Sequence, residues 1–243
     1  MGWRPCGGNL TGRTLAPVVP PGDDLRMARP DALAPALAAV LDAQTRHPGD
    51  RLLVGITGPP AAGKSTLATA LATALVRSGV SAVAVGMDGF HLANVELDRL
   101  GLAGSKGAPQ TFDAEGFVHL LRRLRPADGP VVYAPHFNRQ VNESIGSAVP
   151  VHPGTSVVVV EGNYLLLDQE PWRQVPDLLD LVLYLDAPAR TRREALLRRQ
   201  LGRGLDLRAA SAWVDGSDEA NARVIAATRD RADLVLRRSV PGE

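Results

Sequence analysis

The sequence predicts an α/β protein whose parallel strands are buried between two layers of helices. Short runs of Val, Leu and Ile alternate along the chain with segments whose apolar residues recur at helical spacing. The strand-like runs contain no alternating polar residues, so neither face of these strands is expected to contact water. A glycine-rich turn lies between the first such run and the helix after it. Together these observations favour a parallel sheet with helices on both sides.

The expected elements follow one another without a second domain boundary. The first helix covers 31–46 and ends at His47-Pro48-Gly49, which stops a helix. The predicted order is then a strand at 52–56, a glycine-rich turn at 58–63, a helix to 78–79, a strand at 81–87, a loop or partial lid at 89–113, a helix at 114–125, strands at 131–133, 157–160 and 181–185, helices at 189–201 and 208–229, and a strand at 234–236. We therefore expect residues 28–243 to form one domain.

The first 27 residues are predicted to be a disordered tail. They are rich in Gly, Pro and Arg, show no apolar periodicity and lack the apolar stretch of a secretory signal. Met27 stands just before the first helical pattern and is the expected native start of translation.

Composition gives no reason to expect nucleic acid or a membrane as a partner. The chain has 27 basic and 26 acidic residues, a formal net charge of +1, and such a balance does not indicate an anionic polymer as a partner. No run of about 18 apolar residues predicts a membrane-spanning helix. Cys6 is the single cysteine, so no internal disulfide can form and a reducing, cytoplasmic location is expected.

The turn after the first strand has the pattern of a phosphate-binding loop. Residues 58–65 read Gly-Pro-Pro-Ala-Ala-Gly-Lys-Ser and match G-x-x-x-x-G-K-[ST] in full, between a predicted strand and a predicted helix. In such a P-loop, backbone N–H groups and the helix N-terminus surround the phosphates of a nucleotide. The lysine bridges the β- and γ-phosphates, and the hydroxyl that follows it binds Mg²⁺. The predicted nucleotide-binding residues are Gly58, Pro59, Ala61, Ala62, Gly63, Lys64, Ser65 and Thr66.

Carboxylates end three of the predicted strands. Ligands of open α/β sheets bind at the carboxyl ends of the strands, so Glu161 is the candidate to hold Mg²⁺ together with Ser65. Asp88 would face the γ-phosphate and could take the proton of an attacking hydroxyl. For Asp186, a capping role and a catalytic role are both open.

Six segments of the chain resemble one family of P-loop kinases. The segments are 55–66, 87–94, 106–113, 160–166, 218–222 and 228–233, and they lie in the same order as in the family over residues 50–237. The family contains uridine kinase, phosphoribulokinase and bacterial pantothenate kinase, and the chain is most similar to its nucleoside/nucleotide kinase branch, sometimes labelled fructokinase-like. The resemblance implies a P-loop NTPase fold with a five-stranded parallel sheet, ATP and Mg²⁺ as cofactors, and Asp88 as the catalytic carboxylate.

The resemblance also implies positions for the two substrates. Arg229 falls in a segment near the nucleotide base of pantothenate kinases. The residues implied to shape the acceptor pocket are His91, Phe112, Asp113, Tyr133, Asn138 and Arg139. Read without the family, Phe112 and Tyr133 are equally well explained as core aromatics, and Trp213 is expected in the core.

An arginine-rich segment at 188–208 is predicted to be a lid that closes over ATP. Seven arginines lie between 190 and 208, and a guanidinium matches the oxygens of a transferring phosphoryl group. Not all of them can face inward on one helix. Arg193 and Arg199 are the two favoured as catalytic.

These observations predict a kinase that moves the γ-phosphate of ATP to a hydroxyl of a small metabolite. The acceptor stays open among a nucleoside, a sugar and a pantothenate-like alcohol. The alternative function is a P-loop ATPase or nucleotide-dependent regulatory protein without an acceptor. A homodimer is possible because members of the family often pair.

Overall fold

The structure is a computed structural model, and it describes residues 30–238. The predicted tail and the expected start at Met27 lie outside these residues. Within them, no helix combines the length and the apolarity that crossing a bilayer requires.

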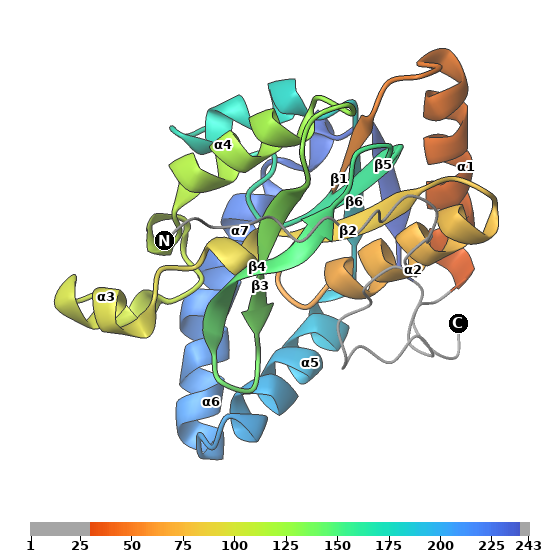
Figure 1. The fold of residues 1–243 in the computed structure, drawn as a ribbon. Helices are drawn as coiled ribbons and strands as arrows, with labels where there is room; N and C mark the ends of the chain where they lie inside the picture. Colours follow the sequence, from red (N-terminus) through yellow and green to blue (C-terminus); the bar gives the residue numbers. More distant parts are fainter. Residues whose placement is uncertain (1–29, 239–243) are drawn as a thin grey trace, which may run out of the picture.

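A five-stranded parallel sheet forms the centre of the fold, as predicted (Figure 1). The strands lie in the order β2-β5-β1-β6-β7, and every neighbouring pair is parallel. Their bounds are β1 Leu52–Thr57, β2 Ala82–Gly86, β5 Val157–Glu161, β6 Leu181–Asp186 and β7 Leu234–Arg237. Because β5 lies between β1 and β2, segments far apart in sequence meet at the carboxyl edge of the sheet.

Both faces of this sheet are covered, which explains why its strands are apolar up to their carboxyl ends. Leu52, Val54 and Ile56 of β1 pack with α1 (Pro30–Arg46) and α2 (Lys64–Arg77) in one core cluster. Leu53 points the opposite way, into a second cluster that includes Phe117 and the rest of the buried face of α4. Alternate residues of each strand therefore enter different cores. On this second face lie α4 (Ala114–Leu124) and α7 (Glu219–Ala226).

A β-hairpin outside the main sheet corrects one prediction. The strand expected at 131–133 is real but belongs to β3 (Val132–Asn138), which pairs antiparallel with β4 (Glu143–Val151) in a separate two-stranded sheet. β4 was not predicted because Gly146, Pro150 and polar residues interrupt its apolar pattern. In Figure 1 the hairpin crosses in front of the main sheet.

The predicted lid consists of two helices. α5 (Ala189–Gly202) is followed by a turn, and α6 (Leu207–Trp213) begins where the Asp206 side chain accepts a hydrogen bond from the N–H of Ala209. The helix expected at 208–229 is present as α6, a π-helical turn at Val214–Asp218 and α7, and it ends at Ala226. Such π-helical turns are frequently found at functional sites. The loop at 89–113 contains α3 (Asn94–Arg99).

Candidate active site

Three strand ends assemble the candidate site. The P-loop follows β1, Asp88 follows β2, and Glu161 ends β5. The register places Glu161 directly between Ile56 of β1 and Gly86 of β2. The carboxylate of Glu161 therefore lies between the phosphate-binding loop and Asp88, at the edge of the sheet where open α/β proteins bind ligands.

Glycine is required at the first position of the P-loop. Gly58 has a φ of 147°, and a Cβ there would lie 2.4 Å from the carbonyl oxygen of Leu185. The P-loop lies too close to the backbone of β6 at this point for any side chain to fit.

Lys64 is buried within the loop. Its Nζ donates hydrogen bonds to the carbonyl oxygens of Gly58 at 2.8 Å and Pro59 at 3.1 Å. Burial lowers the pKa of Lys64 to about 8, although Glu161 and Asp88 oppose the shift. The hydrogen-bond partners of the ammonium are therefore neutral carbonyl groups of the loop. A bound phosphate would provide an anionic partner for it.

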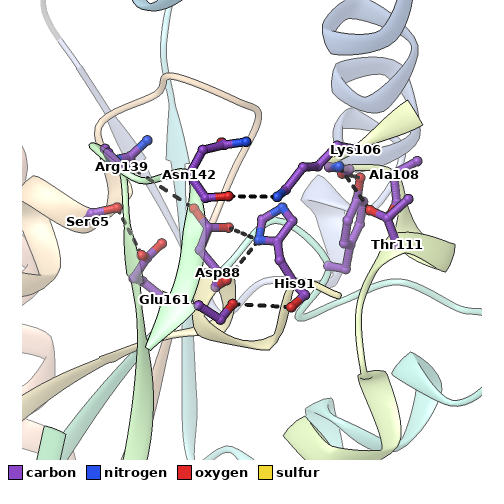
Figure 2. Close-up of polar contacts among 12 residues, drawn as sticks. Ser65, Asp88, His91, Lys106, Ala108, Thr111, Arg139, Asn142 and Glu161 are labelled. Atoms are coloured by element: carbon purple, nitrogen blue, oxygen red, sulfur yellow. Dashed lines mark hydrogen bonds and ion pairs between the residues drawn. The ribbon is translucent and has the colours of Figure 1, made fainter. Parts of the chain in front are cut away.

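Ser65 and Glu161 together provide the oxygen ligands that Mg²⁺ prefers. Ser65 Oγ donates a hydrogen bond to Glu161 Oε1 at 2.9 Å (Figure 2). Burial and the nearby Asp88 raise the pKa of Glu161 to about 6, although Lys64 and the hydrogen bond from Ser65 oppose the shift. Among residues 30–238, no cluster of three or more His, Cys, Asp or Glu side chains could hold a metal. The pair thus fits an ion that completes its shell with water and phosphate oxygens, as Mg²⁺ does.

Glu161→Gln is expected to stabilise the protein in the absence of nucleotide and Mg²⁺ at pH 8. Because the pKa of Glu161 rises from 4.5 to about 6 on folding, its contribution to stability is complete below pH 4.5 and is lost as the pH rises through 6. The difference should be on the order of 1–2 kcal/mol. Denaturant unfolding of both proteins at pH 4.5 and pH 8 measures it. An equal gap at the two pH values would contradict this account.

Asp88 remains ionised beside several cations. Burial raises the pKa of Asp88, but His91, Arg139, Arg199 and Lys64 lower it by more, so that the net shift is downward. Arg139 lies 3.9 Å from Asp88 Oδ2 and His91 Nδ1 lies 4.0 Å from Oδ1. Neither contact is a close hydrogen bond, so both oxygens of Asp88 stay available to a ligand (Figure 2).

His91 presents an acceptor nitrogen in its neutral form, which burial favours. Burial lowers its pKa, and Nδ1 lies 2.8 Å from the carbonyl oxygen of Asp88. This contact assigns the proton to Nδ1 and leaves Nε2 as a hydrogen-bond acceptor. The ring centroids of Phe112 and Phe137 lie 4.0 and 4.8 Å from that of His91, so the imidazole is fixed between two aromatic rings.

One cavity of about 260 Å³ joins these groups. Of the residues predicted from the sequence, its walls contain Ala61, Gly63, Lys64, Ser65, Thr66, Asp88, His91, Phe112, Arg139, Glu161 and Arg199. They come from the P-loop, two strand ends, the hairpin and the lid. Gly58, Pro59 and Ala62 belong to the same loop but do not line the cavity.

The structure does not bring five other predicted residues to the cavity. Arg193 forms a bidentate ion pair with Asp215 on the lid surface. Asp113 caps α4 by accepting from the N–H of Gly116, and Asn138 accepts from the N–H groups of the hairpin turn. The remaining two are Tyr133, which is 52% exposed on β3, and Arg229, which lies 3.6 Å from Asp186.

Several cavity residues were missed by sequence reasoning. They are Lys106, Asn142, Asn163, Gln200, Arg203, Trp213, Asp218 and Asn221. The expectation that Trp213 is a core residue was wrong, because the π-helical turn beside it leaves it partly exposed at the cavity. Lys106, Asp218 and Asn221 lie in segments that carried the family resemblance, which was the available signal. Nothing in the sequence marks Asn142, which arrives from the hairpin turn.

Comparison with known proteins gives concordant results. The model of the "Phosphoribulokinase / Uridine kinase family" matches residues 53–241. The uncharacterised protein YggC of Escherichia coli is 33% identical over 211 residues, which cover 86% of each chain. A "putative uridine kinase" of Schizosaccharomyces pombe is 36% identical over 161 residues, 64% of this chain and 68% of that protein. A crystal structure of a "putative fructose transport system kinase" from Silicibacter sp. TM1040 is 41% identical with a TM-score of 0.77, covering 84% of this chain and 98% of that one.

Proposed function

Because this chain belongs to the phosphoribulokinase / uridine kinase family and is an ATP-dependent small-molecule kinase, we propose that Asp88 acts on the acceptor hydroxyl. The single observation that carries this assignment is its place in the cavity: an ionised carboxylate with two available oxygens, in the same cavity as Lys64 of the P-loop. The γ-phosphate bound by Lys64 and the hydroxyl bound by Asp88 would then meet across the cleft.

The P-loop holds the donor. Backbone N–H groups of the loop bind the β-phosphate, Lys64 exchanges its carbonyl partners for β- and γ-phosphate oxygens, and Thr66 reaches toward the α-phosphate. Ser65 and Glu161 would hold Mg²⁺, which supplies positive charge against the phosphate oxygens when bound.

Transfer requires one proton to leave the acceptor. Asp88 orients the hydroxyl in line with the γ-phosphorus and takes its proton as the new O–P bond forms and the bond to the bridging oxygen of ADP breaks. His91 Nε2 accepts a hydrogen bond from a second donor group of the acceptor. Phe112 packs against the His91 ring and keeps it in this orientation.

Arg139 and Arg199 line the cavity close to Asp88. Arg139 comes from the hairpin and Arg199 from α5, and both lower the pKa of Asp88 through their charge. We assign them to the equatorial oxygens of the phosphoryl group, where a guanidinium stabilises the transition state.

Arg199→Gln should lower kcat about 10²-fold, because one charged donor to the transferring group is lost, with a much smaller change in the KM for ATP. Arg193→Gln is the matched control on the same helix, since its partner is Asp215 at the surface. We expect that variant to stay within about twofold of the parent, as is usual for exposed pairs. Steady-state kinetics of both variants decides; equal losses would mean that the lid acts as a whole rather than through Arg199.

The proposed function is tested by the dependence of ADP formation on an acceptor. Purified protein is given Mg-ATP with nucleosides, sugars, sugar phosphates and pantothenate. Stimulation by one class is the expected result. ADP formation that is indifferent to every acceptor, yet abolished by Lys64→Ala, would favour the alternative of a P-loop ATPase, which the relatives do not favour.

A further inference from the structure

Two cations line the cavity without forming an ion pair among the described residues. Lys106 comes from the loop between α3 and α4, and Arg203 follows the last residue of α5. Among residues 30–238, neither forms an ion pair within 4.0 Å of a carboxylate. Burial lowers the pKa of Lys106, Glu143 opposes the shift, and the charge of Arg203 adds to it. Two cations that line one cavity favour the binding of an anion between them.

The ammonium of Lys106 is held firmly by neutral groups. Nζ donates hydrogen bonds to Asn94 Oδ1 on α3 and to the carbonyl oxygen of Asn142 in the hairpin turn at 2.9 Å. It also lies 5.3 Å from the ring centroid of Phe137. In Figure 2 it lies near His91, with Asn142 between it and Arg139 in the view. These contacts fix the position of the charge without neutralising it.

The choice of lysine at this position is itself informative. The chain contains only two lysines, Lys64 and Lys106, while every other basic residue is arginine. Both lysines line the same cavity, and Lys64 is the phosphate-binding lysine of the P-loop. A lysine presents a compact charge that directs its donors freely, whereas arginine would impose a planar fork.

We propose that the acceptor carries its own anionic group, a carboxylate or a phosphate, which binds between Lys106 and Arg203 while its hydroxyl meets Asp88. The inference rests on the proposed kinase function and narrows its substrate class: an anionic alcohol is preferred over a neutral nucleoside or sugar. Asp218 attracts Arg203 from within the same cavity, but its carboxylate lies beyond ion-pair distance of both cations and leaves their charge for the ligand.

This arrangement also couples acceptor binding to the lid. Arg203 stands at the end of α5, whereas Lys106 belongs to the opposite wall. An anion that contacts both would hold the lid helix against the cavity, and water would be excluded only when the correct acceptor is present.

The test compares matched pairs of acceptors that differ in charge. ADP formation with Mg-ATP is measured for glycerate and glycerol, pantothenate and pantothenol, and fructose 6-phosphate and fructose. In the pair that is turned over, the anionic member should have a kcat/KM about 100-fold higher, as expected for two charge-assisted contacts. The carboxylate pairs and the phosphate pair separate the two kinds of anion.

Variants assign the preference to the two cations. Lys106→Gln should raise the acceptor KM about 10- to 100-fold, leave the KM for ATP unchanged and abolish the preference for the anionic member, and Lys106→Arg should restore part of it. Arg203→Gln, at an exposed position, should have a weaker effect of the same kind. Arg198→Gln, a lid arginine outside the cavity wall, is the control and should change nothing.

Two outcomes would overturn the inference while leaving the kinase function intact: a neutral acceptor used as well as its anionic partner, or an anionic preference that survives both variants. If no acceptor is turned over, the proposed kinase function is wrong. Chemical labelling of Lys106 then tests the anion site independently of activity. With Mg-ADP present, inorganic phosphate should slow the acetylation of Lys106 by an N-hydroxysuccinimide ester, measured by peptide mass spectrometry, and glycerol should not. Equal labelling under both conditions would refute the anion site.

Discussion

Asp88→Asn lowers kcat by about 10²- to 10⁴-fold and leaves the Kd for Mg-ATP within about threefold. An amide has the same shape as the carboxylate but cannot take a proton, so the loss should match that of a general base. Asp88 is the only member of the site that combines a lowered pKa with two oxygens free of close hydrogen bonds. Single-turnover transfer to the identified acceptor and calorimetric titration with ATP measure the two quantities.

The control for this variant is Asp98→Asn, which changes an exposed carboxylate on α3 and should leave both quantities unchanged. If ATP binding disappeared in Asp88→Asn, Asp88 would be a metal-binding or structural residue. The assignment of the proton to Asp88 would then be wrong, although the phosphate site would stand.

Lys64→Ala reduces kcat/KM about 10³-fold or more and weakens ATP binding. The buried ammonium of Lys64 lies against the carbonyl groups of the P-loop. A charged donor at this position stabilises the negative charge that develops on the γ-phosphate oxygens in the transition state. The free energy of unfolding should change little without nucleotide, because the lost hydrogen bonds to Gly58 and Pro59 are offset by the removal of a buried charge.

Lys64→Arg distinguishes charge from geometry at the same position. Lys64 is 7% exposed, so a longer planar guanidinium cannot occupy its path without displacing the loop. We expect a loss close to that of the alanine variant. Near-normal turnover by Lys64→Ala would contradict the assignment of Lys64 to the phosphate site. ATP binding by each variant is measured on the same protein sample that is used for turnover.

The parts of the fold that sequence predicts are those dictated by burial on two faces. Strands β1 and β5 are apolar up to their last residues, Thr57 and Glu161, because alternate residues enter different cores, and that pattern is visible in the sequence itself. The β3–β4 hairpin is harder to predict from the sequence than the strands of the main sheet. Each of its strands contacts solvent along much of its length, so β4 needs no continuous apolar run and gives no clear signal.

The same distinction applies to the site. Lys64, Asp88 and Glu161 stand at strand ends, where local sequence is enough to place them at one edge. The lid arginines could not be sorted in this way. Arg193 and Arg199 are six residues apart and therefore differ by about 120° around α5, and the apolar residues of this helix define no clear inner face. Only the packed structure shows that Arg199 lines the cavity.

The two-stranded hairpin separates the enzyme into parts that can change independently. Donor chemistry resides on the sheet edge, where Gly58, Lys64 and Glu161 are constrained by neighbouring backbone. Arg139 and Asn142 instead belong to an appendage that shares no backbone pairing with that sheet. Mutations at Asn142 and its neighbours in the hairpin turn are therefore expected to alter acceptor preference while nucleotide binding at the sheet edge persists, which gives protein engineers a segment to exchange.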